Sequence, residues 1–128
     1  MKALVATAGG VFAVDLDEQE VTPGDPFDPA PQLETGLPRV IQAAASGATI
    51  VALVDAKPSL LLSYDAGTTW REGGRGLPPG RAIAIARNDP DLIVYAARNR
   101  LYVSRNAGVF WTALEVELPE IDALAVTE

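Results

Sequence analysis

The stretch that decides the fold is SYDAGTTW, residues 63–70, together with a weaker copy, SRNAGVFW, residues 104–111. The two copies lie about 40 residues apart, and Leu-Pro dipeptides recur at a similar interval along the chain. Repetition at this spacing is typical of proteins in which one supersecondary unit is stacked several times. The sequence therefore predicts a repeated structural unit.

Each repeat contains short apolar segments separated by turn residues. RAIAIAR, residues 81–87, is followed by the turn NDPD and by LIVYAAR, residues 92–98. Runs of Val, Ile, Leu and Ala bounded by Gly, Pro, Asn and Asp indicate strands joined by hairpins, and no segment has the 3.6-residue period of a helix. Four short strands in about forty residues are typical of one β-propeller blade, so we expect an all-β propeller.

The predicted repeats cover residues 2–38, 39–80 and 81–119, and residues 121–128 are expected to be the first strand of a blade split between the two termini. Propellers have four to eight blades, so three blades leave two apolar faces uncovered. We therefore expect a homodimer in which two chains form a six-bladed ring and exchange their C-terminal strands. Two alternatives stay open: a fragment of a longer chain, and a three-sheet fold of another kind.

SYDAGTTW resembles the Asp box, S-x-D-x-G-x-x-W, of the bacterial-neuraminidase-type (BNR) repeats, and SRNAGVFW resembles a degenerate copy with Asn106 in the aspartate place. The likeness extends from Arg39 to Pro119 and implies a sialidase-like propeller. In that family the box lies between the third and fourth strands, opposite the usual ligand site. The resemblance therefore implies structural roles for Ser63, Asp65, Gly67, Trp70, Ser104, Asn106, Gly108 and Trp111.

The residue types of the two boxes suit a turn. Asp65 and Asn106 can accept backbone hydrogen bonds, glycine supplies positive φ, and tryptophan can cover the hairpin while its indole N–H reaches a carbonyl. The alternative is that Asp65 is a catalytic acid or a metal ligand. The second copy has no carboxylate at this position, which favours the structural interpretation.

The resemblance also implies a ligand-facing rim, formed by the starts of the first strands and the loops between second and third strands. Its arginines could hold a carboxylate or a phosphate, whereas the alternative is solvated charge paired with nearby acids. The candidate ligand-binding residues are Arg39, Asp55, Lys57, Arg81, Arg98, Arg100 and Asp122.

Composition excludes several kinds of chemistry. The chain has no Cys and no His, which removes thiol nucleophiles, Cys/His zinc sites and Ser-His-Asp triads, and we expect neither a metal nor a cofactor. A net charge of −7 argues against nucleic acid and anionic membranes as partners. The acidic segment 15–34 and the arginine-rich segment 71–105 are either ordinary surface or parts that meet across an interface.

The functional prediction is a non-catalytic binding or assembly module for a protein or a small acidic ligand. The alternatives are a glycan-binding or carbohydrate-active propeller, for which Asp55, Glu120 and Asp122 are the candidate carboxylates, and a repeat protein that only self-associates. The loop PGDPFDPAPQLETG, residues 23–36, is of the long, proline-rich kind that is often functional, with Phe27 as a candidate contact.

The N-terminal stretch MKALVATAGGVFAVDLDE has the single lysine and short apolar run of a weak signal peptide, but the repeat assigns it to strands. No apolar run approaches the roughly 20 residues of a membrane span. We therefore expect a soluble protein and favour the cytoplasm over secretion.

Overall fold

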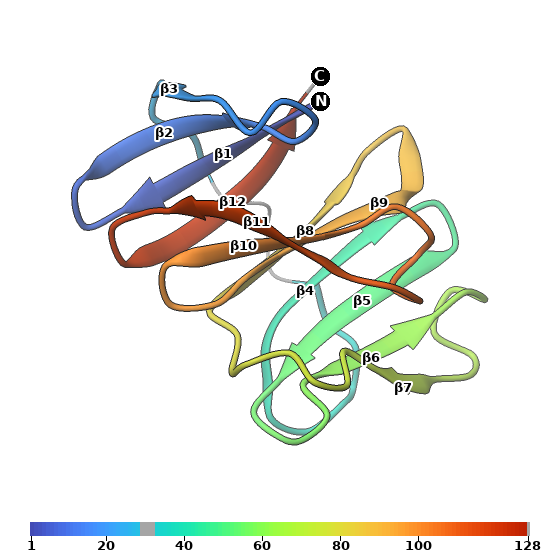
Figure 1. The fold of residues 1–128 in the computed structure, drawn as a ribbon. Helices are drawn as coiled ribbons and strands as arrows, with labels where there is room; N and C mark the ends of the chain where they lie inside the picture. The colour runs from blue at the N-terminus through green and yellow to red at the C-terminus, as the bar shows by residue number, and fades with distance from the viewer. Residues whose placement is uncertain (29–32, 128) are drawn as a thin grey trace.

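The structure is a computed structural model that describes residues 1–28 and 33–127, and this part of the chain is all-β, without a helix. Its strands form three four-stranded antiparallel sheets (Figure 1). The prediction of an all-β protein built from short strands is therefore confirmed. The described residues contain no helix long and apolar enough to cross a membrane.

Sheet 1 joins the two ends of the chain. Its strand order is β12-β1-β2-β3, with β12 running antiparallel to β1 from the pair Lys2 and Thr127 to the pair Thr7 and Ile121. The ends of the chain consequently lie side by side (Figure 1). Its strands are β1 (Lys2–Thr7), β2 (Gly10–Asp15), β3 (Val21–Pro23) and β12 (Ile121–Thr127).

The expected exchange of the C-terminal strand between chains is wrong for this structure, because β12 pairs with β1 of its own chain. The backbone N–H of Ile121 donates to the carbonyl of Arg98 over 2.8 Å, and that of Ala8 donates to the carbonyl of Glu120 over 2.9 Å. Ile121 and Leu124 are 0% and 2% exposed, so the strand also buries its apolar side within the chain. No partner is required to complete sheet 1. The last residue of the predicted strand, 128, lies outside the described residues.

Sheets 2 and 3 are each formed by four consecutive strands. Sheet 2 contains β4 (Val40–Ser46), β5 (Thr49–Val54), β6 (Leu60–Ser63) and β7 (Arg71–Gly73). Sheet 3 contains β8 (Ala82–Ala86), β9 (Asp89–Ala96), β10 (Arg100–Ser104) and β11 (Thr112–Glu117). Strand β8 packs against both β12 and β4, so sheet 3 lies between the other two (Figure 1).

Sheet 3 is buried on both faces. One apolar cluster, which includes Val5, Val14 and Val94, fills the space between sheets 1 and 3. A second, which includes Leu53 and Tyr95, fills the space between sheets 2 and 3. A strand that is buried on both faces has apolar residues at consecutive positions, which explains the sequence LIVYA in β9.

Sheets 1 and 2 each turn one face away from sheet 3. On sheet 1 this outward face carries half-buried Leu4 and Ala6, which alternate with the buried core residue Val5. On sheet 2, Leu33 and Leu37 pack over Ala52 and its neighbours. The loop predicted at residues 23–36 thus contributes to this packing, although residues 29–32 lie outside the described part of the chain.

The acidic and arginine-rich segments meet inside the chain. Arg105, in the turn after β10, pairs with Asp17, in the turn after β2, over 2.9 Å and donates to the carbonyl of Leu16 over 3.1 Å. Both charged side chains are more than half exposed, so the pair orients the two sheets more than it stabilises them.

Candidate functional site

One edge of the three sheets is formed by the links that enter β4, β8 and β12 and by the β5–β6, β9–β10 and β1–β2 turns, and we call this edge the rim. Backbone hydrogen bonds tie the links to the turns: the N–H of Asp55 donates to the carbonyl of Arg39 over 2.9 Å, and that of Arg81 to Ala96 over 2.7 Å. These bonds fix the positions from which the rim side chains project.

Residues 63–70 and 104–111, which we call the first and second tryptophan turns, lie at the edge opposite the rim. The N–H of Ala66 in the first turn donates to the carbonyl of Ala48 in the β4–β5 turn over 2.9 Å. The N–H of Ala107 in the second turn donates to Asp91, at the start of β9, over 3.0 Å. The turns therefore take no part in any site on the rim.

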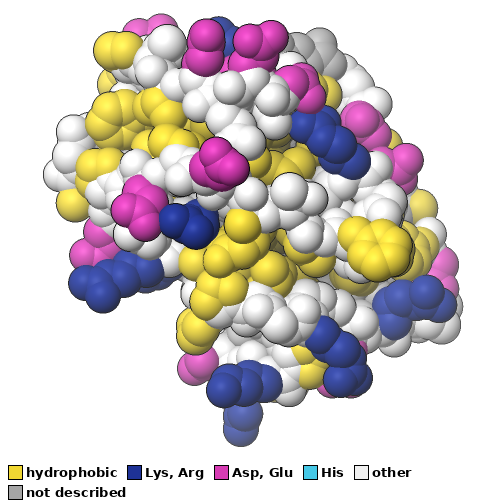
Figure 2. All heavy atoms as spheres, in the orientation of Figure 1, with side chains coloured by type: hydrophobic (Ala, Val, Ile, Leu, Met, Phe, Trp, Pro, Cys, Tyr) yellow, Lys and Arg dark blue, Asp and Glu magenta, His cyan; other side chains and the backbone are white. Residues whose placement is uncertain are grey.

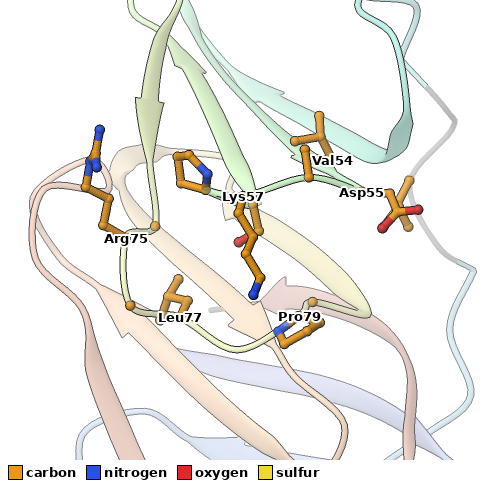
Figure 3. Close-up of a pocket in the computed structure, with 13 residues that line it drawn as sticks. Val54, Asp55, Lys57, Arg75, Leu77 and Pro79 are labelled. Atoms are coloured by element: carbon orange, nitrogen blue, oxygen red, sulfur yellow. The ribbon is translucent and has the colours of Figure 1, made fainter.

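The first hollow of the rim, which we call the Lys57 hollow, has a volume of about 620 Å³ (Figure 3). It lies between the β5–β6 turn and the link from β7 to β8. The Lys57 side chain points into it, toward the segment that carries Leu77 and Pro79 (Figure 3). Its lining is Ile41, residues 54–59, residues 74–77, Pro79 and Gly80.

A buried tyrosine anchors the link that forms one wall of this hollow. The Tyr95 hydroxyl donates to the carbonyl of Pro78 over 2.6 Å and lies 2.9 Å from the Ser59 hydroxyl, which must then be the donor to tyrosine. Burial raises the pKa of Tyr95, so its proton stays in place to make this bond. A Cβ on Gly80 would lie 2.6 Å from both Leu53 Cδ1 and the Tyr95 hydroxyl, so the link packs this closely only as glycine.

The second hollow, which we call the Arg98 hollow, has a volume of about 610 Å³ and shares Pro79 and Gly80 with the first. Its lining is Pro78–Arg81, Ala97–Arg100, Tyr102 and Glu117. Hydrophobic side chains gather over the link between β7 and β8, with basic side chains on both sides of it (Figure 2).

Two of the arginines in the second hollow have acidic partners. Arg81 pairs with Glu120, and Arg100 pairs with Glu117 over 3.0 Å. Among the described residues, Arg98 has no ion pair, and neither has Lys57 in the first hollow. Each hollow therefore contains one cation, Lys57 or Arg98, that forms no ion pair within the described residues.

The structure brings five of the seven predicted rim residues into the two hollows. Asp55 and Lys57 line the first, and Arg81, Arg98 and Arg100 line the second.

Arg39 and Asp122 line neither hollow. Arg39 adopts φ 61° and contributes its carbonyl to Asp55 instead.

Sequence reasoning missed Arg75, Leu77 and Pro79, which form a wall of the Lys57 hollow. They lie in the segment GGRGLPPG, whose glycines and prolines indicate a loop between strands. The composition identifies the loop but does not show that it folds over the β5–β6 turn. Arg75 lies 3.7 Å from Glu72, and both side chains are exposed.

The carboxylates proposed for glycoside hydrolysis do not share a hollow. Asp55 lines the Lys57 hollow, Glu120 pairs with Arg81, and Asp122 lines neither hollow. Hydrolysis of a glycosidic bond requires two carboxyl groups on either side of one substrate position. The described residues also contain no group of three or more potential metal-ligating side chains.

Asp65 is fully engaged in the first turn. One carboxylate oxygen accepts from the Ser63 hydroxyl over 2.8 Å and from the N–H of Thr69 over 2.8 Å, and the other accepts from the Thr69 hydroxyl over 2.6 Å. The bonds from Thr69, followed by that from Ser63, lower the pKa of Asp65 to about 2. This arrangement keeps the carboxylate charged and bound, whereas a general acid needs a proton near neutral pH.

Comparisons with models of known protein families and with curated proteins gave no match to this chain.

Proposed function

We propose that this chain is half of a six-bladed β-propeller of the Asp-box type, completed by a second copy, and that it is a non-catalytic module whose rim binds a small acidic ligand. Each part has its own support and its own test.

Support for ring completion comes from the uneven covering of the sheets. Sheet 3 is packed on both faces, whereas sheets 1 and 2 have sheet 3 on one face only. The outward faces carry half-buried apolar side chains, including Leu4 and Ala6 on sheet 1 and Leu61 on sheet 2. A two-fold axis would place sheet 1 of each copy against sheet 2 of the other, where Leu33 and Leu37 already cover part of the outward face.

Light scattering tests this assembly, and we expect twice the single-chain mass of 13.5 kDa. Ala6→Glu places a charge on the outward face of sheet 1 and should give single chains. Ala113→Glu is the matched control, because Ala113 is exposed on β11 of sheet 3 and should leave the mass unchanged. A wild-type mass near 13.5 kDa would overturn the ring.

The observation that carries the ligand proposal is that Lys57 and Arg98, which form no ion pair in the part of the chain the structure describes, lie beside two hollows that adjoin at Pro79 and Gly80. Concave sites with a few convergent polar groups are where small ligands bind. In a chain of net charge −7, a cation that forms no ion pair beside a hollow provides a local positive charge for an anion.

NMR titration with acetate and with inorganic phosphate tests this binding. We expect the amide signals of residues 56, 57, 59 and 98–100 to shift with at least one of the two anions. The double variant Lys57→Met, Arg98→Gln should lose these shifts. Arg87→Gln removes a positive charge at the opposite edge and should keep them. The absence of shifts with both anions would contradict the proposal.

A further inference from the structure

We infer that the Lys57 hollow selects a monocarboxylate with an apolar body, such as an aliphatic or aromatic carboxylic acid, in preference to phosphate. This inference rests on the proposed function, since it specifies which acidic ligand the rim accepts.

Lys57 and Arg75 line the hollow, and only Arg75 has an acidic side chain within ion-pair distance. Arg75, at its edge, lies 3.7 Å from Glu72, which leaves Lys57 as the lining cation without an acidic partner in the described structure. Asp55 lines the same hollow and would repel additional negative charge. One ammonium group beside a carboxylate suits a single negative charge better than two.

Phosphate binding requires several N–H donors, and some of those in the walls are missing or already used. Pro58 and Pro79 have no N–H. The N–H of Asp55 already donates to Arg39, and that of Leu77 donates to Gly74 over 3.1 Å. The ammonium group alone can hold a carboxylate. The shortage of N–H donors should therefore weaken carboxylate binding less than phosphate binding.

Apolar side chains form most of the remaining wall. Ile41 is 45% exposed, an unusual degree for an isoleucine, and Val54, Leu77 and Pro79 line the same space. The volume of about 620 Å³ lies within the range of small-molecule sites. Since Lys57 lines the same hollow as Leu77 and Pro79, a carboxylate bound to its ammonium group would leave its apolar body against these walls (Figure 3).

A chain-length series tests the apolar contribution. Acetate, butyrate and hexanoate differ only in methylene groups, and each methylene buried should tighten binding by about fourfold. We expect NMR titration of the wild-type chain to show this rise, with inorganic phosphate binding more weakly than hexanoate. Equal affinities across the series, or tighter binding of phosphate, would overturn the inference and leave the proposed function standing. No binding of any of these anions would overturn both.

A pair of variants tests the role of the ammonium group. Lys57→Met keeps a flexible apolar side chain and removes the charge, so it should reduce hexanoate binding by up to about fivefold while 1-hexanol binds as before. Arg87→Met lowers the net charge equally at the opposite edge and should preserve the preference for hexanoate over 1-hexanol. Retention of that preference in Lys57→Met, with an unchanged amide spectrum elsewhere, would contradict the inference.

Discussion

The two tryptophan turns are built on different side chains and share one hydrogen-bonded frame. In the first turn, the Ser63 hydroxyl donates to Asp65 Oδ1 over 2.8 Å. In the second, the Ser104 hydroxyl donates to Asn106 Oδ1 over 3.0 Å. In both turns the glycine N–H donates to the serine hydroxyl over 2.8 Å. The turn therefore depends on an acceptor oxygen at this position, which aspartate and asparagine both provide.

The turns differ in what they add to this frame. Asp65 binds the Thr69 hydroxyl through its second oxygen, whereas Phe110 occupies the corresponding place in the second turn. Val109 and Phe110 are 64% and 74% exposed. The indole N–H of Trp111 donates to the carbonyl of Gly108 over 3.2 Å, while Trp70 packs on the outward face of sheet 2.

The residue after the serine connects each turn to the next sheet. The Tyr64 hydroxyl donates to the carbonyl of Ala107 over 2.6 Å, which joins the first turn to the second. Arg105 in the second turn binds Asp17 and the carbonyl of Leu16 in sheet 1. The frame is therefore local, whereas the side chain inserted after the serine sets the contact between sheets.

The largest difference between the turns should appear when each glycine becomes alanine. Gly67 and Gly108 have φ of 92° and 88°, so both substitutions introduce backbone strain of about 1–3 kcal/mol. A Cβ on Gly108 would also lie 3.0 Å from Leu62 Cδ1, and Leu62 is 2% exposed, whereas the nearest atom to a Cβ on Gly67 is 3.7 Å away. We expect Gly108→Ala to lower the free energy of unfolding by about 3 kcal/mol and Gly67→Ala by about 1–2 kcal/mol.

Urea denaturation with fitted slopes measures both changes. Gly47→Ala is a useful reference, because Gly47 has φ 58° and a Cβ added there would have no atom within 4 Å. Equal destabilisation by Gly67→Ala and Gly108→Ala would show that crowding against Leu62 has no effect.

Replacement of the serines tests whether charge strengthens the shared frame. Ser63 and Ser104 are 1% and 0% exposed, so alanine leaves the glycine N–H without its acceptor in both turns. We expect each substitution to lower the free energy of unfolding by about 1–3 kcal/mol, and the two decreases to agree within about 0.5 kcal/mol. Chemical denaturation of Ser63→Ala and Ser104→Ala gives both values. A clearly larger cost for Ser63→Ala would mean that the carboxylate, and not only its oxygen, stabilises the frame.

Acid sensitivity should distinguish the turns because only the first contains a carboxyl group. The folded state lowers the pKa of Asp65 from 3.8 to about 2, so its contribution to stability is present above pH 3.8 and is lost as the pH falls toward about 2. We expect the Tm difference between the wild type and Asp65→Asn to shrink across this window. The pKa of Asp15 is also lowered, by the N–H groups of Glu18 and Asp17, but it titrates in both proteins and cancels in the difference.

Asn106→Asp is the reciprocal variant for this experiment. It places a carboxylate in the second turn, where Phe110 offers a backbone N–H but no hydroxyl, so its acid-sensitive change in Tm should be smaller than that of Asp65. A Tm difference between the wild type and Asp65→Asn that stays constant from pH 4 to pH 2 would exclude the charge of Asp65 as a source of stability.

These turns also show how much of the fold the sequence could predict. Gly67 and Gly108 have positive φ as expected, because only the glycine of such a turn is free of a Cβ. Ala66 and Ala107 have φ of 59° and 60°, which no residue preference indicates. The apolar runs predicted strands correctly because each is bounded by turn residues.

Contacts between distant segments were harder to predict. The apolar residues of 121–127 predicted a strand. Their pattern does not indicate whether the partner strand belongs to the same chain. At the rim, the loop position of Lys57 and Arg98 followed from the repeat. The wall around Lys57 depends on Tyr95 bonding to Ser59 and Pro78, which are far from it in sequence.

The smallest effect on stability should come from making the exposed part of the second turn resemble the first. The double substitution Val109→Thr, Phe110→Thr changes two side chains that are mostly exposed, so the free energy of unfolding should change by no more than about 0.5 kcal/mol per site. The frame should persist, since Asn106 accepts from the backbone N–H of residue 110 and not from its side chain. Denaturation in urea measures the change, and a loss well above this value would mean that Phe110 packs against sheet 1 in solution. Leu16 and Leu114 beside it would then be the first side chains to substitute.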